Sequence, residues 1–262
     1  MTQILFAILI ITVIGAIAGI ILSLASKFMA VPVDEKTAAI REALPGANCG
    51  SCGYSGCDGY AAAIASGEAE PNKCTPGGEQ TAAALSDILG VTVKTQRKIA
   101  VIHCNHSCDK AKASFNYEGL ASCTAESLIH GGSLNCKYGC LGFGDCAAVC
   151  DSNAIKIIDT VATVDKDLCK GCGKCVDACP KNLISVENCR QTYYISCNNN
   201  EKGAIARKEC TVACIGCMKC QKTCEHGAIT VTDFLAHIDN DKCIGCGKCM
   251  EVCPEKCIVK MN

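Results

Sequence analysis

The spacing of the cysteines constrains the fold of this chain more than any other feature, because one pattern occurs twice. Seven cysteines between positions 140 and 179 recur 74 positions later, between positions 214 and 253. Cys123 and Cys136 recur at the same offset as Cys197 and Cys210. Nine matched cysteines without a gap indicate an internal duplication. The two copies are expected to span residues 123–179 and 197–253.

Each copy ends in a run with the spacing C-x2-C-x2-C-x3-C-P, at Cys169–Pro180 and at Cys243–Pro254. The second copy also opens with such a run, at Cys214–Cys224. This is the spacing of bacterial two-cluster ferredoxins, in which the fourth cysteine of each run ligates the cluster held by the other run. In both copies 18 residues separate the two runs, and the β-branched stretches within them are typical of a short hairpin.

The crossed pairing predicts the ligands of three [4Fe–4S] clusters. They are Cys214, Cys217, Cys220 and Cys253; Cys243, Cys246, Cys249 and Cys224; and Cys169, Cys172, Cys175 and Cys150. A fourth site departs from the pattern, because Phe143 stands where the second copy has Cys217. We expect Cys136, one turn before Cys140, to complete the set formed by Cys140, Cys146 and Cys179.

A separate group of four cysteines precedes the duplication. Cys49, Cys52, Cys57 and Cys74 follow the pattern C-x2-C-x4-C-x16-C. Three ligands on one Gly-rich loop and one remote ligand suit a cubane cluster, whereas structural zinc sites usually use two close pairs. This group brings the predicted number of clusters to five.

The remaining cysteines allow a sixth site. Cys104 and Cys108 are separated by three residues and are candidate ligands, completed by two of Cys123, Cys197 and Cys210. The alternative is that these cysteines are buried small hydrophobic residues. Cys189 and Cys257 have no partner at a useful spacing, so we expect them to be structural.

The start of the chain is apolar and uncharged from Ile4 to Ser26. About 20 such residues span a bilayer as a helix. A cleaved signal peptide would have a positively charged start, which Met1-Thr2-Gln3 lacks. Lys27 and Lys36 follow the run, and positive residues favour the cytoplasmic side. We therefore predict one membrane anchor that contacts lipid, with the N-terminus outside and the remainder inside.

The cysteine content points to a reducing compartment. Twenty-seven cysteines in a secreted chain would indicate disulfides, but close C-x2-C spacing favours thiolate ligands, and thiolates persist in the cytoplasm. A net charge of −1 gives no concentrated basic surface, which argues against nucleic-acid binding. The chain has no G-x-G-x-x-G motif after a strand, so no NAD site of its own is expected.

The expected fold class is α+β. Helices are predicted over 33–44, 58–66 and 76–90, and a strand over 98–103. The predicted segments are an anchor over 1–30, a four-cysteine [4Fe–4S] domain over 31–90, a connecting segment over 91–135 with candidate extra ligands, and two tandem two-cluster ferredoxin units over 136–188 and 189–262.

The order of these parts resembles the B subunit of the Rnf complex. The resemblance rests on the anchor, the segment GANCGSCGYSGC and the ferredoxin runs; CKYGCLGFGDC is similar to the longer, cluster-rich form of anaerobic bacteria. Asp151 and Glu225 depart from the usual pattern, since Pro usually follows the fourth cysteine. The resemblance implies an electron-transfer subunit of a cell-membrane enzyme that couples electron transfer from soluble reduced ferredoxin to NAD⁺ with pumping of Na⁺ or H⁺. It further implies that electrons pass through the clusters to partner subunits.

Two other functions fit the same residues. One is a polyferredoxin subunit of another membrane hydrogenase or dehydrogenase, and the other is a zinc-stabilised interaction module at a membrane. Four lysines near the cysteine runs are either a docking surface for an acidic ferredoxin or a solvated face. These are Lys170, Lys174, Lys242 and Lys248.

Overall fold

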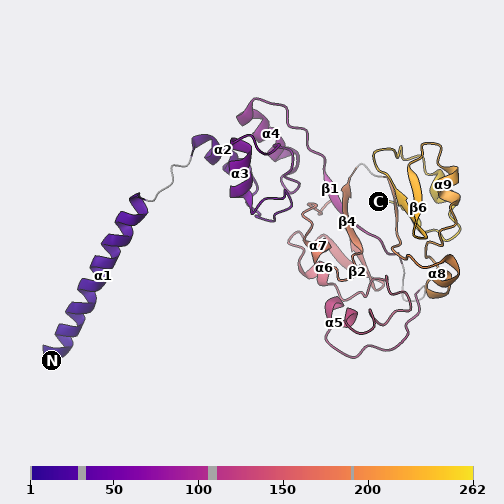
Figure 1. Cartoon of the computed structure of the whole chain (residues 1–262), viewed down its shortest axis with the longest axis horizontal. Coiled ribbons are helices and arrows are strands. Elements are labelled where there is room, and N and C mark those ends of the chain that lie inside the picture. Colours follow the sequence, from indigo (N-terminus) through magenta and orange to yellow (C-terminus); the bar gives the residue numbers. More distant parts are fainter. Residues whose placement is uncertain (1, 29–33, 106–110, 190–191, 262) are drawn as a thin grey trace.

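The structure of the chain, a computed structural model, describes residues 2–28, 34–105, 111–189 and 192–261. The first helix, α1 (Thr2–Phe28), stands apart from the other elements (Figure 1). Within the described part of the chain, no helix has both the length and the apolar character that crossing a membrane requires.

Three helices form a small unit after α1. They are α2 (Glu35–Ala43), α3 (Cys57–Ala65) and α4 (Gly78–Leu89). Their apolar side chains recur at helical spacing, and Ile40, Tyr60 and Leu85 are fully buried in a common core. Gly90 ends α4 in the left-handed conformation, with φ of 68°. The three predicted helices are confirmed, each with slightly different bounds.

The first ferredoxin unit is built on two antiparallel ribbons. One is the predicted hairpin of β2 (Ile155–Ile158) and β3 (Val161–Val164). The other pairs β1 (Lys98–Ile102) with β4 (Ile184–Asn188), so β1 belongs with this unit although it lies in the segment predicted as a connection. Short helices carry Cys123 and parts of the two cysteine runs: α5 (Cys123–Ser127), α6 (Asp145–Ala148) and α7 (Lys174–Asp177).

The second unit repeats this arrangement. Its hairpin is β6 (Ile229–Thr232) with β7 (Leu235–Ile238), and its second ribbon pairs β5 (Tyr193–Ile195) with β8 (Ile258–Lys260). The helices are α8 (Gly203–Glu209), α9 (Lys219–Thr223) and α10 (Lys248–Glu251). The hairpin strands start 74 positions after those of the first unit, as the duplication predicts. Each unit has its own buried core.

The two units contact each other (Figure 1). The His103 Nδ1 atom, just after β1, lies 2.7 Å from the carbonyl oxygen of Ile195 at the end of β5. The side-chain amide of Asn240 donates to Glu187 Oε2 at 2.7 Å. The first contact holds the ends of β1 and β5 close together, which determines where the cysteines that follow these strands lie.

Candidate iron–sulfur centres

The first group of thiols lies on the loop before α3 and on the loop after it. Cys49, Cys52 and Cys57 come together with Cys74, as predicted: burial raises the pKa of Cys74, and the other three thiols raise it further. The Asn48 side chain holds the loop in shape by accepting the backbone N–H of Cys57 at 2.8 Å. The return of the chain to Cys74 is fixed by Tyr60, whose hydroxyl donates to the Glu70 carbonyl at 2.7 Å and accepts the Lys73 N–H at 3.0 Å.

The first ferredoxin unit brings Cys150 together with the run of Cys169, Cys172 and Cys175. Burial and then the Cys169 and Cys172 thiols raise the pKa of Cys175 to about 11. Backbone N–H groups point at the sulfurs: Ala100 N donates to Cys169 Sγ at 3.3 Å, and Ala154 N donates to Cys150 Sγ at 3.3 Å. Donors of this kind stabilise negative charge on a ligand sulfur.

The second unit has two such groups. Cys214, Cys217, Cys220 and Cys253 line one cavity, and Cys224, Cys243, Cys246 and Cys249 line another. Burial, with Cys214 as the next contribution, raises the pKa of Cys220 to about 11. Burial likewise raises the pKa of Cys249. Each cavity therefore takes three cysteines from one run and the fourth from the other run, as the crossed pairing requires.

The remaining group of the first unit differs from our expectation in one residue. Cys140, Cys146 and Cys179 line a cavity together with Cys123, not with Cys136. Burial and then the Cys140, Cys179 and Cys123 thiols raise the pKa of Cys146 to about 12. Cys123 is therefore the fourth thiol of this cavity, which lacks a counterpart of Cys217 because Phe143 occupies that position.

Cys123 reaches this cavity because Asp145 fixes the start of α5. The Asp145 carboxylate accepts the backbone N–H groups of Cys123 at 2.9 Å and Thr124 at 3.0 Å, and the hydroxyl of Ser122 at 2.9 Å. Burial alone would raise the pKa of Asp145, but the hydrogen bonds from Thr124, Cys123 and Ser122 lower it. The second copy has Lys219 at the matching position, so a carboxylate there was the sequence signal that α5 is special to the first unit.

Cys136 lies in a different cavity, which it lines with Cys104, Cys197 and Cys210. The predicted candidates for a sixth site were Cys104, Cys108, Cys123, Cys197 and Cys210. Three of them meet here, Cys123 lies in the cavity beside Cys140, and Cys108 falls outside the described residues. Cys123 and Cys197 share the sequence offset of the duplication but not an equivalent place in the fold.

The two cysteines without a predicted partner differ from each other. Cys189 packs at the edge of the core of the first unit. Cys257 is buried next to a group of thiols, with its Sγ 3.6 Å from that of Cys253. Hydrogen bonding to Cys257 lowers the pKa of Cys253 to about 5.

Tight glycine turns let the cysteine loops wrap around their cavities. Gly142 and Gly216 occupy matching positions two residues after Cys140 and Cys214, with φ of 77° and 61°. A Cβ atom would lie 2.6 Å from the Thr160 carbonyl oxygen at Gly142 and 2.8 Å from the Phe234 carbonyl oxygen at Gly216. Only glycine combines this backbone conformation with so close an approach.

The donor set fits a metal–sulfur cluster. Four small cavities of about 20 Å³ are each lined by four or five cysteines. Among the described residues, no three His, Cys, Asp or Glu side chains are arranged to hold a single metal ion. Burial raises the pKa of the Cys140, Cys146 and Cys220 thiols because a buried thiolate loses hydration, and iron bound there would compensate the thiolate charge.

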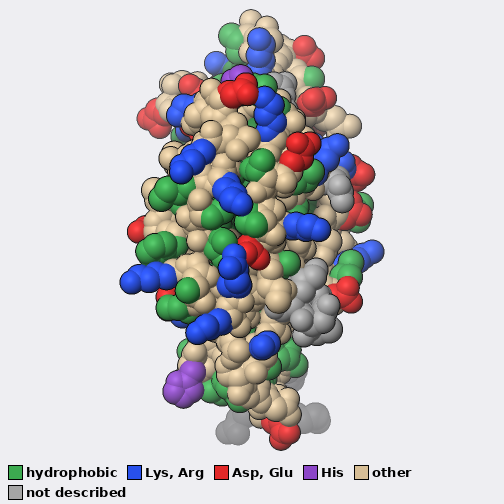
Figure 2. Space-filling view, turned by 90° about the vertical axis from the view of Figure 1, so that its right-hand side faces the viewer, with side chains coloured by type: hydrophobic (Ala, Val, Ile, Leu, Met, Phe, Trp, Pro, Cys, Tyr) green, Lys and Arg blue, Asp and Glu red, His purple; other side chains and the backbone are tan. Residues whose placement is uncertain are grey.

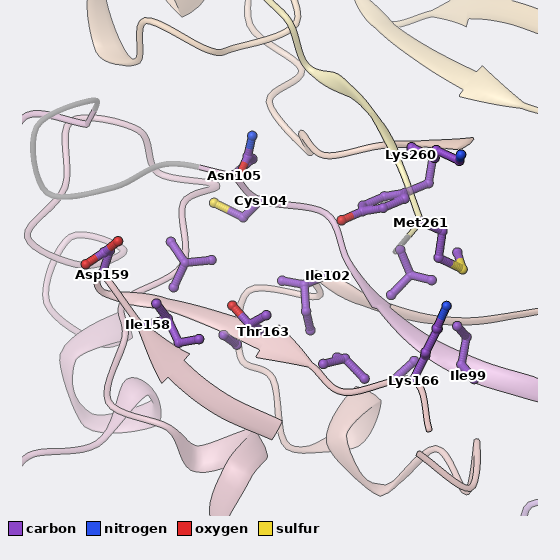
Figure 3. A pocket seen from close by; sticks show the side chains of 16 residues that line it. Ile99, Ile102, Cys104, Asn105, Ile158, Asp159, Thr163, Lys166, Lys260 and Met261 are labelled. Carbon is purple, nitrogen blue, oxygen red and sulfur yellow. The ribbon is translucent and has the colours of Figure 1, made fainter. Parts of the chain in front are cut away.

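A larger cavity lies elsewhere, between the two units (Figure 3), and has a volume of about 330 Å³. β1 and β3 line one side, and Tyr194, Lys260 and Met261 line the other. Cys104 lies at the opposite end of this cavity from Lys166 and Met261 (Figure 3). Cys104 is the one cysteine among the residues that line this cavity, so the cavity does not resemble the four that are lined by several cysteines.

Three protein-family models match parts of the chain. A family described as a putative Fe–S cluster matches residues 44–76, a 4Fe–4S binding domain matches residues 162–185, and a 4Fe–4S dicluster domain matches residues 213–257. These matches cover the first thiol group, the second run of the first unit and most of the second unit. They show iron–sulfur domains of more than one kind.

Full-length relatives extend the similarity to nearly the whole chain. The chain is 43% identical to the B subunit of the Na(+)-translocating ferredoxin:NAD(+) oxidoreductase complex of Acetobacterium woodii, over 94% of this chain and 74% of that protein. It is 34% identical to the B subunit of the ion-translocating oxidoreductase complex of Methanosarcina acetivorans, over 94% of both chains. It is 36% identical to the B subunit of the proton-translocating ferredoxin:NAD(+) oxidoreductase complex of Clostridium ljungdahlii, over 91% of this chain and 85% of that protein.

Proposed function

Because this chain belongs to the B subunits of the Rnf family of ion-translocating oxidoreductases, we propose that it accepts electrons from reduced ferredoxin and passes them to partner subunits of a ferredoxin:NAD⁺ oxidoreductase. It is an electron-transfer iron–sulfur subunit of a membrane-bound complex. The observation that carries the proposal is the gathering of thiols into groups of four along the chain.

We assign five [4Fe–4S] clusters to five groups of thiols. The ligands are Cys49, Cys52, Cys57 and Cys74; Cys123, Cys140, Cys146 and Cys179; Cys150, Cys169, Cys172 and Cys175; Cys214, Cys217, Cys220 and Cys253; and Cys224, Cys243, Cys246 and Cys249. The assignment keeps the sequence prediction except that Cys123 replaces Cys136. A cluster of this kind supplies reversible one-electron chemistry when bound.

The residues of the chain set the environment of each group. Backbone N–H groups of Ala154 and Leu183 donate to Cys150 Sγ at 3.3 Å and to Cys179 Sγ at 3.5 Å, and so stabilise the added negative charge of a reduced centre. Apolar side chains such as Ile155 and Leu183 cover the thiols and limit the entry of water. No residue of this chain is assigned to bind NAD, which we leave to a partner subunit.

The first thiol group lies close to the run of Cys169, Cys172 and Cys175, which supports electron transfer between these two groups. Gly171, inside the run of the first unit, approaches Thr75, the residue after Cys74: a Cβ on Gly171 would lie 2.9 Å from Thr75 Cγ2. The Lys174 ammonium, whose pKa is raised mainly by Asp151, also interacts with Cys172 and Cys49. The cysteine loops of the helical unit (α2 to α4) and of the first ferredoxin unit are therefore in contact.

The proposed docking of a soluble ferredoxin relies on positive charge. Lys and Arg side chains run down the middle of the face on which α9 lies, with Asp and Glu more often near its edges (Figure 2). Of the four lysines near the cysteine runs, three are paired locally: Lys174 with Asp151, Lys242 with Asp239 and Lys248 with Glu225. Because these three lysines are already paired with neighbouring carboxylates, they fit a solvated surface better than a specific docking site. We therefore assign ferredoxin docking to the whole face that carries the Lys and Arg side chains (Figure 2).

We further propose that the apolar run Ile4–Ser26 tethers the subunit to the membrane, with the clusters on the cytoplasmic side. The full chain, expressed without its partners, should sediment with membranes and need detergent for release. A variant lacking residues 1–30 should remain in the supernatant. Equal sedimentation of the two would contradict the anchor.

Anaerobic purification of the full chain tests the function. At least about 20 iron and as many acid-labile sulfides per chain are expected for five clusters. Reduced ferredoxin should bleach the brown protein and produce the electron paramagnetic resonance (EPR) signals of reduced [4Fe–4S] centres. A colourless protein that holds zinc would contradict the proposal and would favour the zinc-stabilised module instead.

A further inference from the structure

The cavity that contains Cys136 lies at the junction of the two ferredoxin units and takes two thiols from each. Cys104 and Cys136 come from the first unit, and Cys197 and Cys210 come from the second. The family models that match the chain cover residues 44–76, 162–185 and 213–257, and so include none of these four residues. No other group of thiols described above draws on both units.

The four thiols form two structurally equivalent pairs. Cys136 and Cys210 are related by the 74-residue offset of the duplication. Cys104 and Cys197 have no such offset, yet each lies two residues after the last residue of an equivalent strand, β1 or β5. The equivalence extends to the backbone: His103 N donates to the Leu183 carbonyl at 2.7 Å, and Ser196 N donates to the Cys257 carbonyl at 2.8 Å.

The surroundings of these thiols are built from polar groups that point at sulfur. Asn199 is only 1% exposed, and its side-chain amide donates to Cys136 Sγ at 3.4 Å and to Glu209 Oε2 at 2.9 Å. Backbone N–H groups of Cys214 and Asn199 donate to Cys197 Sγ at 3.2 and 3.5 Å. A buried amide that donates to a sulfur is best satisfied when that sulfur is an anionic ligand.

The position of the site is fixed by contacts between the units. Ala111, on a segment of the first unit, forms an antiparallel bridge with Cys210 of the second. The His103 ring lies between the units, with Nε2 2.8 Å from Ser185 Oγ and Nδ1 2.7 Å from the Ile195 carbonyl oxygen. The four thiols are therefore gathered by the docked pair of units, and neither unit has the complete set.

We propose that Cys104, Cys136, Cys197 and Cys210 hold a sixth [4Fe–4S] cluster that links the two ferredoxin units. The inference deepens the proposed function and rests on it, since it assumes that the chain carries clusters of this type. The cluster joins the units covalently through iron–sulfur bonds and puts a one-electron centre where the units meet. It also accounts for Cys136 and Cys210, which the crossed pairing leaves without a cluster.

Single and double cysteine variants of the full chain, purified anaerobically, test the site by iron and sulfide content. The wild type should hold about 24 iron, and Cys136→Ala and Cys210→Ala should each lose about four, together with the same component of the EPR spectrum. Cys189→Ala, which alters a cysteine outside every thiol group described here, is the matched control and should lose none. Unchanged iron in both Cys136→Ala and Cys210→Ala would overturn the sixth site.

The double variant Cys123→Ala/Cys136→Ala separates this assignment from the one expected from sequence. If the two cysteines serve different clusters, the double variant loses about eight iron, the sum of the two single losses. If Cys136 belongs to the Cys140 site, the double variant loses no more than Cys136→Ala alone, and the inference fails.

Two controls distinguish loss of the sixth cluster from misfolding of the variant and from failure of the proposed function. Cys136→Ser keeps the side-chain volume and an oxygen ligand, so it should retain iron and change only one EPR component. Loss of every component in that variant would contradict a local role. A wild-type chain without iron would overturn the proposed function itself, whereas a wild type with about 20 iron would overturn the sixth cluster alone.

Discussion

The Sγ atoms of Cys253 and Cys257 lie 3.6 Å apart, so a cysteine that is not assigned as a ligand hydrogen-bonds one that is. The residue four positions after the last cysteine of each of the other three runs is Ala154, Leu183 or Ala228. Ala154 and Leu183 donate a backbone N–H to the matching sulfur, and Cys257 can add its thiol to such a contact. With Cys253 bound to iron as a thiolate, the Cys257 S–H is the donor.

The Cys257 thiol should therefore raise the reduction potential of the cluster held by Cys214, Cys217, Cys220 and Cys253. A donor to a ligand sulfur stabilises the reduced cluster more, since that state carries one more negative charge. Cys257→Ala should lower the potential by about 40 mV, which is the equivalent of about 1 kcal/mol for one electron. A redox titration followed by EPR measures the shift.

The first unit supplies the matched control for this effect. Leu183 occupies the position of Cys257, so Leu183→Cys should raise the potential of the cluster beside Cys179. The two changes should shift two different EPR components in opposite directions. Equal potentials in Cys257→Ala and the wild type would show that the thiol has no such effect.

Asp145 should control how firmly the first unit holds the cluster ligated by Cys123. Asp145→Ala removes the acceptor of two backbone N–H groups at the start of α5, a loss of about 1 kcal/mol. Cys123 should then detach more often, and chelators should remove iron from this site several-fold faster. The matching variant Lys219→Ala should leave the rate unchanged, because no helix starts at Cys197 among the described residues of the second unit, as α5 starts at Cys123 in the first.

The contribution of Asp145 should also depend on pH with a definite sign. Hydrogen bonds lower the pKa of this carboxyl from its ordinary value of 3.8 when the chain folds. A group with a lowered folded-state pKa stabilises the fold above its ordinary pKa, and this stability is lost as the pH falls through the folded-state value. The difference between the wild type and Asp145→Asn in denaturant unfolding should thus persist from pH 8 to about pH 5 and shrink below about pH 4. A difference that grows on acidification would contradict it.

Tyr60 should stabilise the loop that returns Cys74 to the first thiol group. Its buried hydroxyl links the Glu70 carbonyl with the Lys73 N–H, and burial raises its pKa to about 12. Tyr60→Phe leaves both backbone groups without this partner, and we expect a loss of about 1–3 kcal/mol in the free energy of unfolding of the helical unit. Iron should leave this cluster first, as seen by loss of one EPR component. Tyr54→Phe, which alters the half-buried neighbouring ring, is the control.

Asp151 and Glu225, which stand where Pro is usual, should matter little for cluster retention. They form equivalent ion pairs, Asp151 with Lys174 and Glu225 with Lys248, each at 2.6 Å. Both pairs are largely exposed, and exposed pairs contribute little because water and salt screen them. Asp151→Pro and Glu225→Pro should keep the full iron content and the unfolding midpoint of the wild type. Loss of one cluster in either variant would show that the pair acts on the ligand loop.

Much of the fold followed from local sequence patterns. The hairpins over Ile155–Val164 and Ile229–Ile238 were predicted because β-branched residues alternate between runs of fixed spacing. The same spacing predicted the two groups of thiols that line the two cavities of the second unit. Gly90 marked the end of α4 for a similarly local reason, since a left-handed residue is needed there. Ligands that lie within one loop, such as Cys49, Cys52 and Cys57, are also brought together by the chain itself.

The sequence by itself determined the duplication, the cluster-binding runs and the crossed pairing, because these depend on distances along the chain. Only the tertiary structure decided between Cys123 and Cys136. That choice depends on Asp145 holding α5 against the first unit and on the docking of β1 beside β5, two contacts between segments remote in sequence. The spacing of cysteines along the chain determines which thiols can share a loop. Whether a thiol from another segment joins them depends on tertiary packing. Packing brings Cys104 and Cys197 to one cavity although the 74-residue offset does not relate their strands.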